Sequence, residues 1–197
     1  MHLTDNLYGL VLAGGKSSRM GQDKSELQYY RTNHRTYLYH TIREFCPRTF
    51  VSCRGDQTHI TKSGLDVITD NALYKGPLNG ILSAHHVYPE ASWLVVAVDL
   101  PHVHEDTIKK LVENRDPNKL ATVYATRESE MPEPLIAIWE QKGLKAAEKF
   151  IRETGKSCPR KFLMNEDIKQ IFPENDLELF NANYPEDYKL AKSRISH

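Results

Sequence analysis

Apolar runs alternate along the chain with segments in which apolar residues recur at helical spacing. The short continuous runs are typical of buried strands, and the periodic segments are typical of helices that cover a sheet. Strands are predicted at residues 7–13, 49–53, 66–69, 93–98, 120–126, 135–140, 168–172 and 177–180. Helices are predicted at residues 37–46, 77–87, 104–114, 141–153 and 185–193, and a flexible loop at 29–36. The repeated strand–helix units indicate an α/β fold, a mostly parallel sheet with helices on both faces, in one domain over residues 1–197.

The charge balance of the chain narrows the classes of function. Its 197 residues include 26 Lys and Arg and 26 Asp and Glu, so the formal net charge is zero, which argues against general affinity for nucleic acid. No apolar run reaches the roughly 18 residues that suggest a membrane span. The first residues lack the pattern of a secretory signal, and the three cysteines form neither an even set nor a CxxC pair. A cytoplasmic protein without a disulfide framework is expected.

A glycine-rich, cationic segment follows the first predicted strand. Residues 12–24 read LAGGKSSRMGQDK, and they combine three glycines with Lys16, Arg19 and Lys24. Glycines let a backbone approach a ligand closely, and the cations complement phosphate oxygens. A P-loop is excluded because Leu10 stands where its first glycine belongs, and a dinucleotide fingerprint is excluded because Lys16 replaces its second glycine. The segment predicts a polyphosphate site, and a solvated surface turn is the alternative.

Two acidic residues end other predicted strands. Asp99 follows the run WLVVAV, and Asp70 follows the strand predicted at 66–69. A carboxylate at the mouth of a buried strand needs a partner for its charge, and Mg²⁺ shared with substrate phosphates supplies one. Each aspartate has a structural alternative as a helix cap. In an open parallel sheet these strand ends lie on one edge, so the acids and the glycine-rich segment predict one shared site.

Two further segments can be interpreted either as parts of a binding site or as turns and caps of the fold. Residues 76–80 read GPLNG, which fits a ligand site or a turn with a first-turn proline. Residues 180–188 read FNANYPEDY. Asn181 and Asn183 are expected to leave a strand two residues apart and share a face. Paired amides suit recognition of a heterocycle or the closing of a loop.

The segment at 12–24 resembles the LAGGxSxRMGxDK signature of molybdenum cofactor guanylyltransferases, the MobA-type enzymes. Most of the chain follows the family in order, through Asp70, GPLNG, WLVVAVDLPHV, EPLIAIW and the FNANYPEDY ending. The resemblance implies a Rossmann-like nucleotidyltransferase fold. It also implies transfer of GMP from GTP to the phosphate of molybdopterin, with release of pyrophosphate and dependence on Mg²⁺.

The same resemblance assigns roles to residues of this chain. Arg19, Lys24 and Asp99 are the expected catalytic residues, with Asp99 as the metal ligand. The expected nucleotide-binding residues are Leu12, Ala13, Gly14, Gly15, Lys24, Asp70 and Asp99, and the expected pterin-handling residues are Gly80, Asn181 and Asn183. The chain departs from the family pattern at Ser52, where Asn is common, at the HRTYL of residues 34–38, where Gly-Lys-Pro-Leu is usual, and at Tyr184, where Thr is usual.

The expected reaction needs positioning and charge neutralisation more than a general base, because the attacking phosphate oxygen is already ionised at neutral pH. GTP and molybdopterin are the expected small-molecule partners, cofactor-delivery proteins stay open as protein partners, and no nucleic acid or membrane partner is expected. Two rivals remain: cytidylyl or other nucleotidyl transfer to molybdopterin or a small phosphorylated metabolite, and a non-catalytic GTP-binding module.

Overall fold

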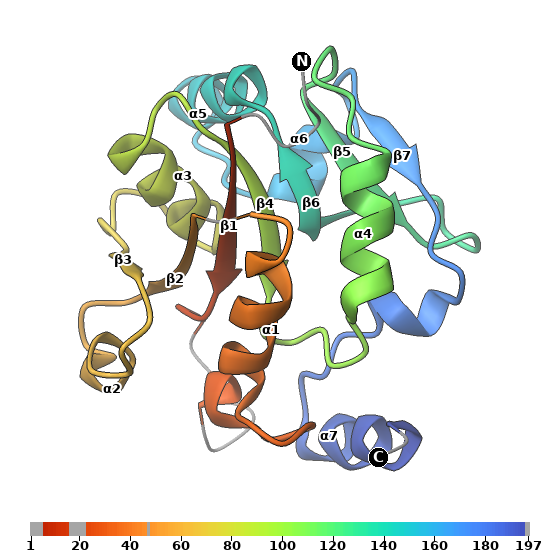
Figure 1. Ribbon diagram of the computed structural model, residues 1–197. Helices are drawn as coiled ribbons and strands as arrows, with labels where there is room; N and C mark the ends of the chain where they lie inside the picture. The colour runs from red at the N-terminus through yellow and green to blue at the C-terminus, as the bar shows by residue number, and fades with distance from the viewer. Residues whose placement is uncertain (1–5, 16–22, 47, 196–197) are drawn as a thin grey trace.

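A seven-stranded sheet with the strand order β3-β2-β1-β4-β6-β5-β7 forms the centre of the computed structural model, which describes residues 6–15, 23–46 and 48–195 (Figure 1). Its strands are β1 (Leu7–Leu12), β2 (Thr49–Cys53), β3 (Val67–Thr69), β4 (Ser92–Ala97), β5 (Ala121–Ala125), β6 (Pro132–Trp139) and β7 (Lys169–Ile171). β1 pairs in parallel with β2 and β4, β2 with β3, and β5 with β7, whereas β6 runs antiparallel between β4 and β5. The prediction of a mostly parallel sheet is confirmed.

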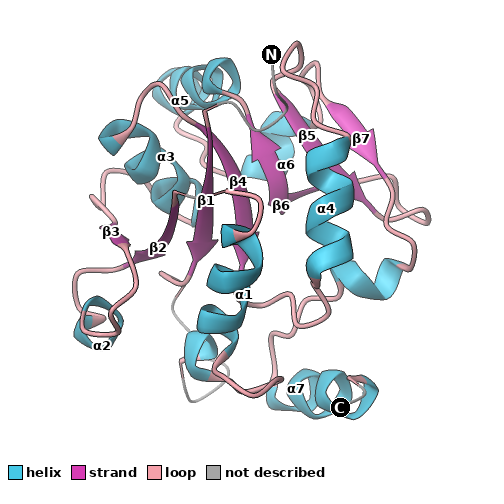
Figure 2. Cartoon of the chain, viewed as in Figure 1, coloured by secondary structure: helices cyan, strands magenta, loops and turns pink. Residues whose placement is uncertain are grey.

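Helices cover both faces of this sheet, as predicted. Neighbouring residues of β1 point to opposite faces, so Val11 belongs to one apolar cluster and Leu10 to another. The cluster with Val11 is completed by α1 (His34–Arg43) and α4 (Glu105–Glu113). The cluster with Leu10 is completed by α3 (Pro77–Val87), α5 (Gln141–Thr154) and α6 (Pro159–Leu163). Figure 2 shows the helices flanking the magenta strands.

A smaller third cluster fastens the C-terminal helix near the start of α1. α7 (Pro185–Arg194) contributes Ala191, and the segment before it contributes Ala182. Both pack against Leu27 and Tyr29, which follow the short 3-10 helix η1 (Lys24–Glu26). Residues just after the glycine-rich segment therefore pack against the FNANYPEDY segment, although the two lie far apart in sequence.

Two local predictions are wrong. The segment 177–180 is not a strand, because Asn175 caps a 3-10 helix, η2 (Asp176–Leu179), in a reciprocal capping box with Glu178. The segment 29–36 is not a flexible loop. Tyr29 is buried, and Asn33 caps α1, which begins at His34, three residues before the predicted start. Short helices at α2 (Thr58–Thr61) and α6 were not predicted, because neither is long enough to show a helical period. Among the described residues, no helix combines the length and apolar character that a membrane crossing requires.

Candidate active site

A pocket of about 760 Å³ opens where the parallel strands β1, β2, β3 and β4 end. The strand order changes direction between β1 and β4, whose last residues Leu12 and Ala97 lie side by side in register. Ligands of open α/β sheets bind at this switch point, beyond the carboxyl ends of the strands. The pocket is within the size range of sites for small molecules and cofactors.

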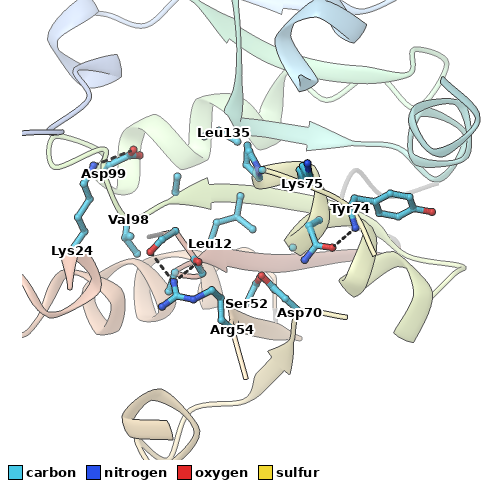
Figure 3. A pocket seen from close by; sticks show the side chains of 18 of the residues that line it. Leu12, Lys24, Ser52, Arg54, Asp70, Tyr74, Lys75, Val98, Asp99 and Leu135 are labelled. Atoms are coloured by element: carbon cyan, nitrogen blue, oxygen red, sulfur yellow. Dashed lines mark hydrogen bonds and ion pairs between the residues drawn. The ribbon is translucent and has the colours of Figure 1, made fainter. Parts of the chain in front are cut away.

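Lys24 and Asp99 lie at one end of the pocket (Figure 3), and Asn183 also lines it. The Lys24 Nζ lies 3.8 Å from Asp99 Oδ2 and donates a hydrogen bond of 2.7 Å to Asn183 Oδ1. The three residues come from η1, from the turn after β4 and from the segment before α7. The predicted meeting of the cationic segment with the acid after β4 is thus present in the fold.

Asp99 is suited to hold a divalent cation. Its Oδ1 is buried and has no hydrogen-bond partner among the described residues. Burial raises the pKa of this carboxyl, and Lys24 acts against that rise. The described residues contain no group of three or more His, Cys, Asp and Glu able to hold a metal. An ion at Asp99 would therefore complete its shell with phosphate oxygens and water, which is the usual environment of Mg²⁺. Asp99 does not cap the following helix, because His104 is the N-cap of α4.

A second carboxylate, Asp70, lies along the same pocket near Gly14 and Gly80. Ser52 at the end of β2 donates a hydrogen bond of 2.5 Å to Asp70 Oδ1. Burial raises the pKa of Asp70, and the hydrogen bond from Ser52 opposes that rise. A β-carbon at Gly80 would lie 2.5 Å from Ser52 Oγ, and one at Gly14 would lie 2.7 Å from Asp70 Oδ2. Both glycines therefore leave room for this hydrogen-bonded pair.

Two residues that the sequence analysis did not single out hold the glycine-rich backbone in place. Arg54 Nη1 donates to the carbonyl oxygens of Gly14 at 2.6 Å and Gly15 at 2.9 Å. Gln57 Nε2 donates to the carbonyl of Ala13 at 3.0 Å and to Asp23 Oδ2 at 2.9 Å. Their position in the sequence could have indicated this role, because both residues follow β2, whose carboxyl end lies beside that of β1.

The pocket gathers most of the predicted site residues. Its lining includes Leu12, Ala13, Gly14, Gly15, Lys24, Asp70, Gly80, Asp99 and Asn183. Asn181 is not among the described lining residues, and its Nδ2 donates to the Leu179 carbonyl at 3.3 Å. Because η2 precedes the two asparagines, the strand-based reason for a shared face is wrong. Arg19 and Lys16 lie outside the described residues.

A mostly parallel α/β sheet with a lysine–carboxylate pair and a braced glycine turn at its switch point defines a nucleotide-binding protein of the nucleotidyltransferase class. The sequence matches the family model described as "MobA-like NTP transferase domain" over residues 9–170, and the chain belongs to this family. The family resemblance drawn from the motifs is confirmed.

Individual relatives agree with this assignment. The "Molybdenum cofactor guanylyltransferase" of Pseudomonas fluorescens is 30% identical over 180 residues, covering 90% of this chain and 89% of that protein. A "Molybdenum cofactor biosynthesis bifunctional protein" of Synechocystis is 36% identical over 92% of this chain, which spans about half (52%) of that longer protein. The solved "Molybdopterin-guanine dinucleotide biosynthesis protein A" of Archaeoglobus fulgidus has a TM-score of 0.77 at 22% identity, covering 94% of this chain and 97% of its own, and shares the fold.

Proposed function

We propose that this protein transfers GMP from GTP to the phosphate of molybdopterin and releases pyrophosphate. The proposal rests above all on the pairing of Lys24 with Asp99 at the pocket end, 3.8 Å apart, in a chain of the MobA-like family. Similarity to proteins named molybdenum cofactor guanylyltransferases supports the choice of substrates. Residues 1–197 are proposed to act as one domain.

The residues take their proposed roles from where they lie. Leu12 to Gly15 bind the nucleotide through the backbone, whose carbonyl oxygens accept hydrogen bonds from Arg54 and Gln57. Lys24 neutralises charge that develops on the departing pyrophosphate, and Arg19 is proposed to share this role. Asp70 contributes to the nucleotide site, and Gly80, Asn181 and Asn183 are proposed to handle the pterin.

The acceptor needs no strong general base, since a phosphate monoester is already ionised at neutral pH. The chain instead aligns the two substrates and excludes unproductive orientations. Asp99 is the proposed ligand of Mg²⁺, which would supply charge stabilisation to the phosphate oxygens.

A nucleotide panel tests the proposal directly. Purified protein is given molybdopterin, Mg²⁺ and either GTP, CTP, ATP or UTP, and pyrophosphate release is measured. The fastest turnover is expected with GTP. Faster turnover with CTP would overturn the guanylyl assignment, and GTP binding by calorimetry without turnover would support a non-catalytic binding module instead.

Two substitutions test the roles of the charged pair. Asp99→Ala and Lys24→Ala should each reduce turnover about a hundredfold, which corresponds to about 3 kcal/mol of lost transition-state stabilisation. A matched control removes an exposed ion pair, because Lys119 pairs with Asp167 at 2.5 Å where β5 begins. Lys119→Ala should leave turnover within about twofold of the unsubstituted protein, since exposed pairs contribute little. Full activity in both Asp99→Ala and Lys24→Ala would exclude the proposed mechanism.

A further inference from the structure

Three successive backbone carbonyls in the turn after β4 accept hydrogen bonds from distant parts of the chain. The Asp99 carbonyl accepts from the Ala182 N–H at 2.8 Å. The Leu100 carbonyl interacts with His34 Nε2 at 3.1 Å, and the Pro101 carbonyl accepts from the Tyr30 hydroxyl at 3.0 Å. The turn that carries the Asp99 carboxylate is therefore held from the α1 side and from the C-terminal side.

The histidine in this arrangement is built into the core. His34 has no exposed surface, and burial lowers its pKa to about 4. Its ring stacks on Tyr37 at 5.8 Å and meets the edge of Tyr29 at 5.0 Å. Because the Leu100 carbonyl is an acceptor, the neutral imidazole must carry its proton on Nε2. Its Nδ1 is buried and has no hydrogen-bond partner among the described residues, which agrees with that tautomer.

The aromatic residues around His34 also connect to the segment that carries Asn183, the hydrogen-bond partner of Lys24. Tyr30 stacks on Tyr37 at 3.9 Å, and Tyr29 packs against Tyr188 of α7 at 5.1 Å. The segment between Ala182 and α7 carries Asn183, which accepts from Lys24. His34 and Tyr37 belong to the HRTYL segment in which the chain departs from the usual Gly-Lys-Pro-Leu of its family.

We propose that His34 and Tyr30 are positioning residues that hold the Asp99 turn so that its carboxylate faces Lys24 and the metal-bound triphosphate. Mg²⁺ requires near-ideal ligand geometry, so a carboxylate on a loosened turn would bind the ion less well. Both side chains contact the backbone of residues 100 and 101, and neither is among the described residues that line the pocket. This inference rests on the proposed function, because it takes Asp99 as the metal ligand.

The test measures metal binding as well as activity. Mn²⁺ affinity is determined by electron paramagnetic resonance in the presence of a non-hydrolysable GTP analogue, for the unsubstituted protein and for Tyr30→Phe and His34→Leu. Each variant lacks one donor, and Mn²⁺ binding should weaken about tenfold, as when a residue that supports a metal ligand is removed. The Mg²⁺ concentration for half-maximal pyrophosphate release should rise by a similar factor.

Two further variants separate positioning from a general effect on folding. His34→Gln keeps an N–H near the position of Nε2 and should restore most of the Mn²⁺ affinity. Tyr39→Phe removes a tyrosine hydroxyl of α1 that donates to Asp66 at 3.2 Å, away from the turn, and should leave metal affinity unchanged. Thermal unfolding of each variant confirms that the measured population is folded.

The outcomes distinguish this inference from the proposed function. If the unsubstituted protein binds Mn²⁺ with the analogue, and Tyr30→Phe and His34→Leu bind it equally well, the positioning role is refuted and the proposed function stands. Equal weakening in Tyr39→Phe, or no rescue by His34→Gln, also refutes it. If the unsubstituted protein binds no Mn²⁺ with the analogue, the proposed function fails and the inference fails with it.

Discussion

A single methyl group at Gly80 would press on the hydrogen-bonded pair that forms one wall of the pocket. The β-carbon of an alanine there would lie 2.5 Å from Ser52 Oγ and 3.0 Å from Leu12 Cδ2. Uncrowded contacts between such atoms are about 3.5–4.0 Å. The hydroxyl of Ser52 would have to move, and with it the 2.5 Å hydrogen bond that it donates to Asp70.

The opposing effects of Gly80→Ala can be compared in magnitude. Overpacking of this kind destabilises a fold by about 1–3 kcal/mol, while replacing a helical glycine by alanine gains up to about 1 kcal/mol. A net loss of about 0–2 kcal/mol in unfolding free energy is expected. Ser52→Ala removes a hydrogen bond to a carboxylate and should lose about 1.5–3 kcal/mol. The loss of unfolding free energy in the double variant should be about 1–2 kcal/mol smaller than the sum of the losses in the two single variants. The reason is that the serine oxygen no longer occupies the space next to the new methyl group.

Urea unfolding of the four proteins in this cycle measures the coupling, and calorimetry with GTP measures its effect on the site. Gly80→Ala alone should weaken GTP binding about tenfold, and adding Ser52→Ala should recover part of that loss. Gly143→Ala is the control: its β-carbon would lie 2.1 Å from the Leu120 carbonyl oxygen, so it should lower stability without coupling to Ser52→Ala. Additivity of the Gly80 and Ser52 substitutions within about 0.5 kcal/mol would refute the steric explanation.

Three other predictions concern Arg54, a buried ion pair of the fold and Asp70. Arg54→Met should weaken GTP binding about tenfold in calorimetry, because two loop carbonyls lose a charged donor, whereas Asp56→Asn, at the exposed side of Arg54, should change it less than threefold. Glu140→Gln should lower the unfolding free energy by about 3–5 kcal/mol in urea, since it removes the carboxylate that pairs with the buried Arg115 at 2.7 Å. Burial raises the pKa of Asp70 in the folded protein, so ionisation of this carboxyl with rising pH destabilises the folded state. Asp70→Asn should therefore unfold at a higher urea concentration than the unsubstituted protein at pH 7. This difference should vanish below about pH 4, where the carboxyl is protonated in the folded and the unfolded state.

The central strands of the sheet were predictable because they are buried on both faces and appear in the sequence as continuous apolar runs. β4 is the clearest case, with all six of its residues buried. The position and direction of β6 were not predictable, since antiparallel pairing between β4 and β5 depends on contacts far apart in sequence. β6 also starts at Pro132, earlier than predicted, because two prolines near its start resemble breakers. Its pairing with β5 shifts register beside Tyr124, which lets a proline-containing segment stay in the sheet.

The chemical groups of the site were more predictable than the contacts that hold them. Asp99, which comes shortly after β4, and the glycine-rich segment that follows β1 could be placed by the rule that parallel strands end at one edge. The donors to backbone carbonyls gave no comparable signal. An arginine, a histidine or a tyrosine in a polar segment has no spacing that reveals a carbonyl partner more than 30 residues away.

This difference also bears on how a chain with zero net charge can bring charged side chains together in its pocket. The ammonium group of Lys24 is held by residues that are distant in the sequence. It lies 3.8 Å from Asp99, and Asn183 accepts one of its hydrogen bonds. Under the proposed function, this pair would receive the triphosphate and its cation. The surrounding backbone is hydrogen-bonded by Arg54 at the glycine turn and by His34 at the Asp99 turn. The charged groups of the pocket thus lie in segments that follow the strand ends, while hydrogen bonds from residues distant in the sequence hold backbone carbonyls at Gly14, Gly15 and Leu100.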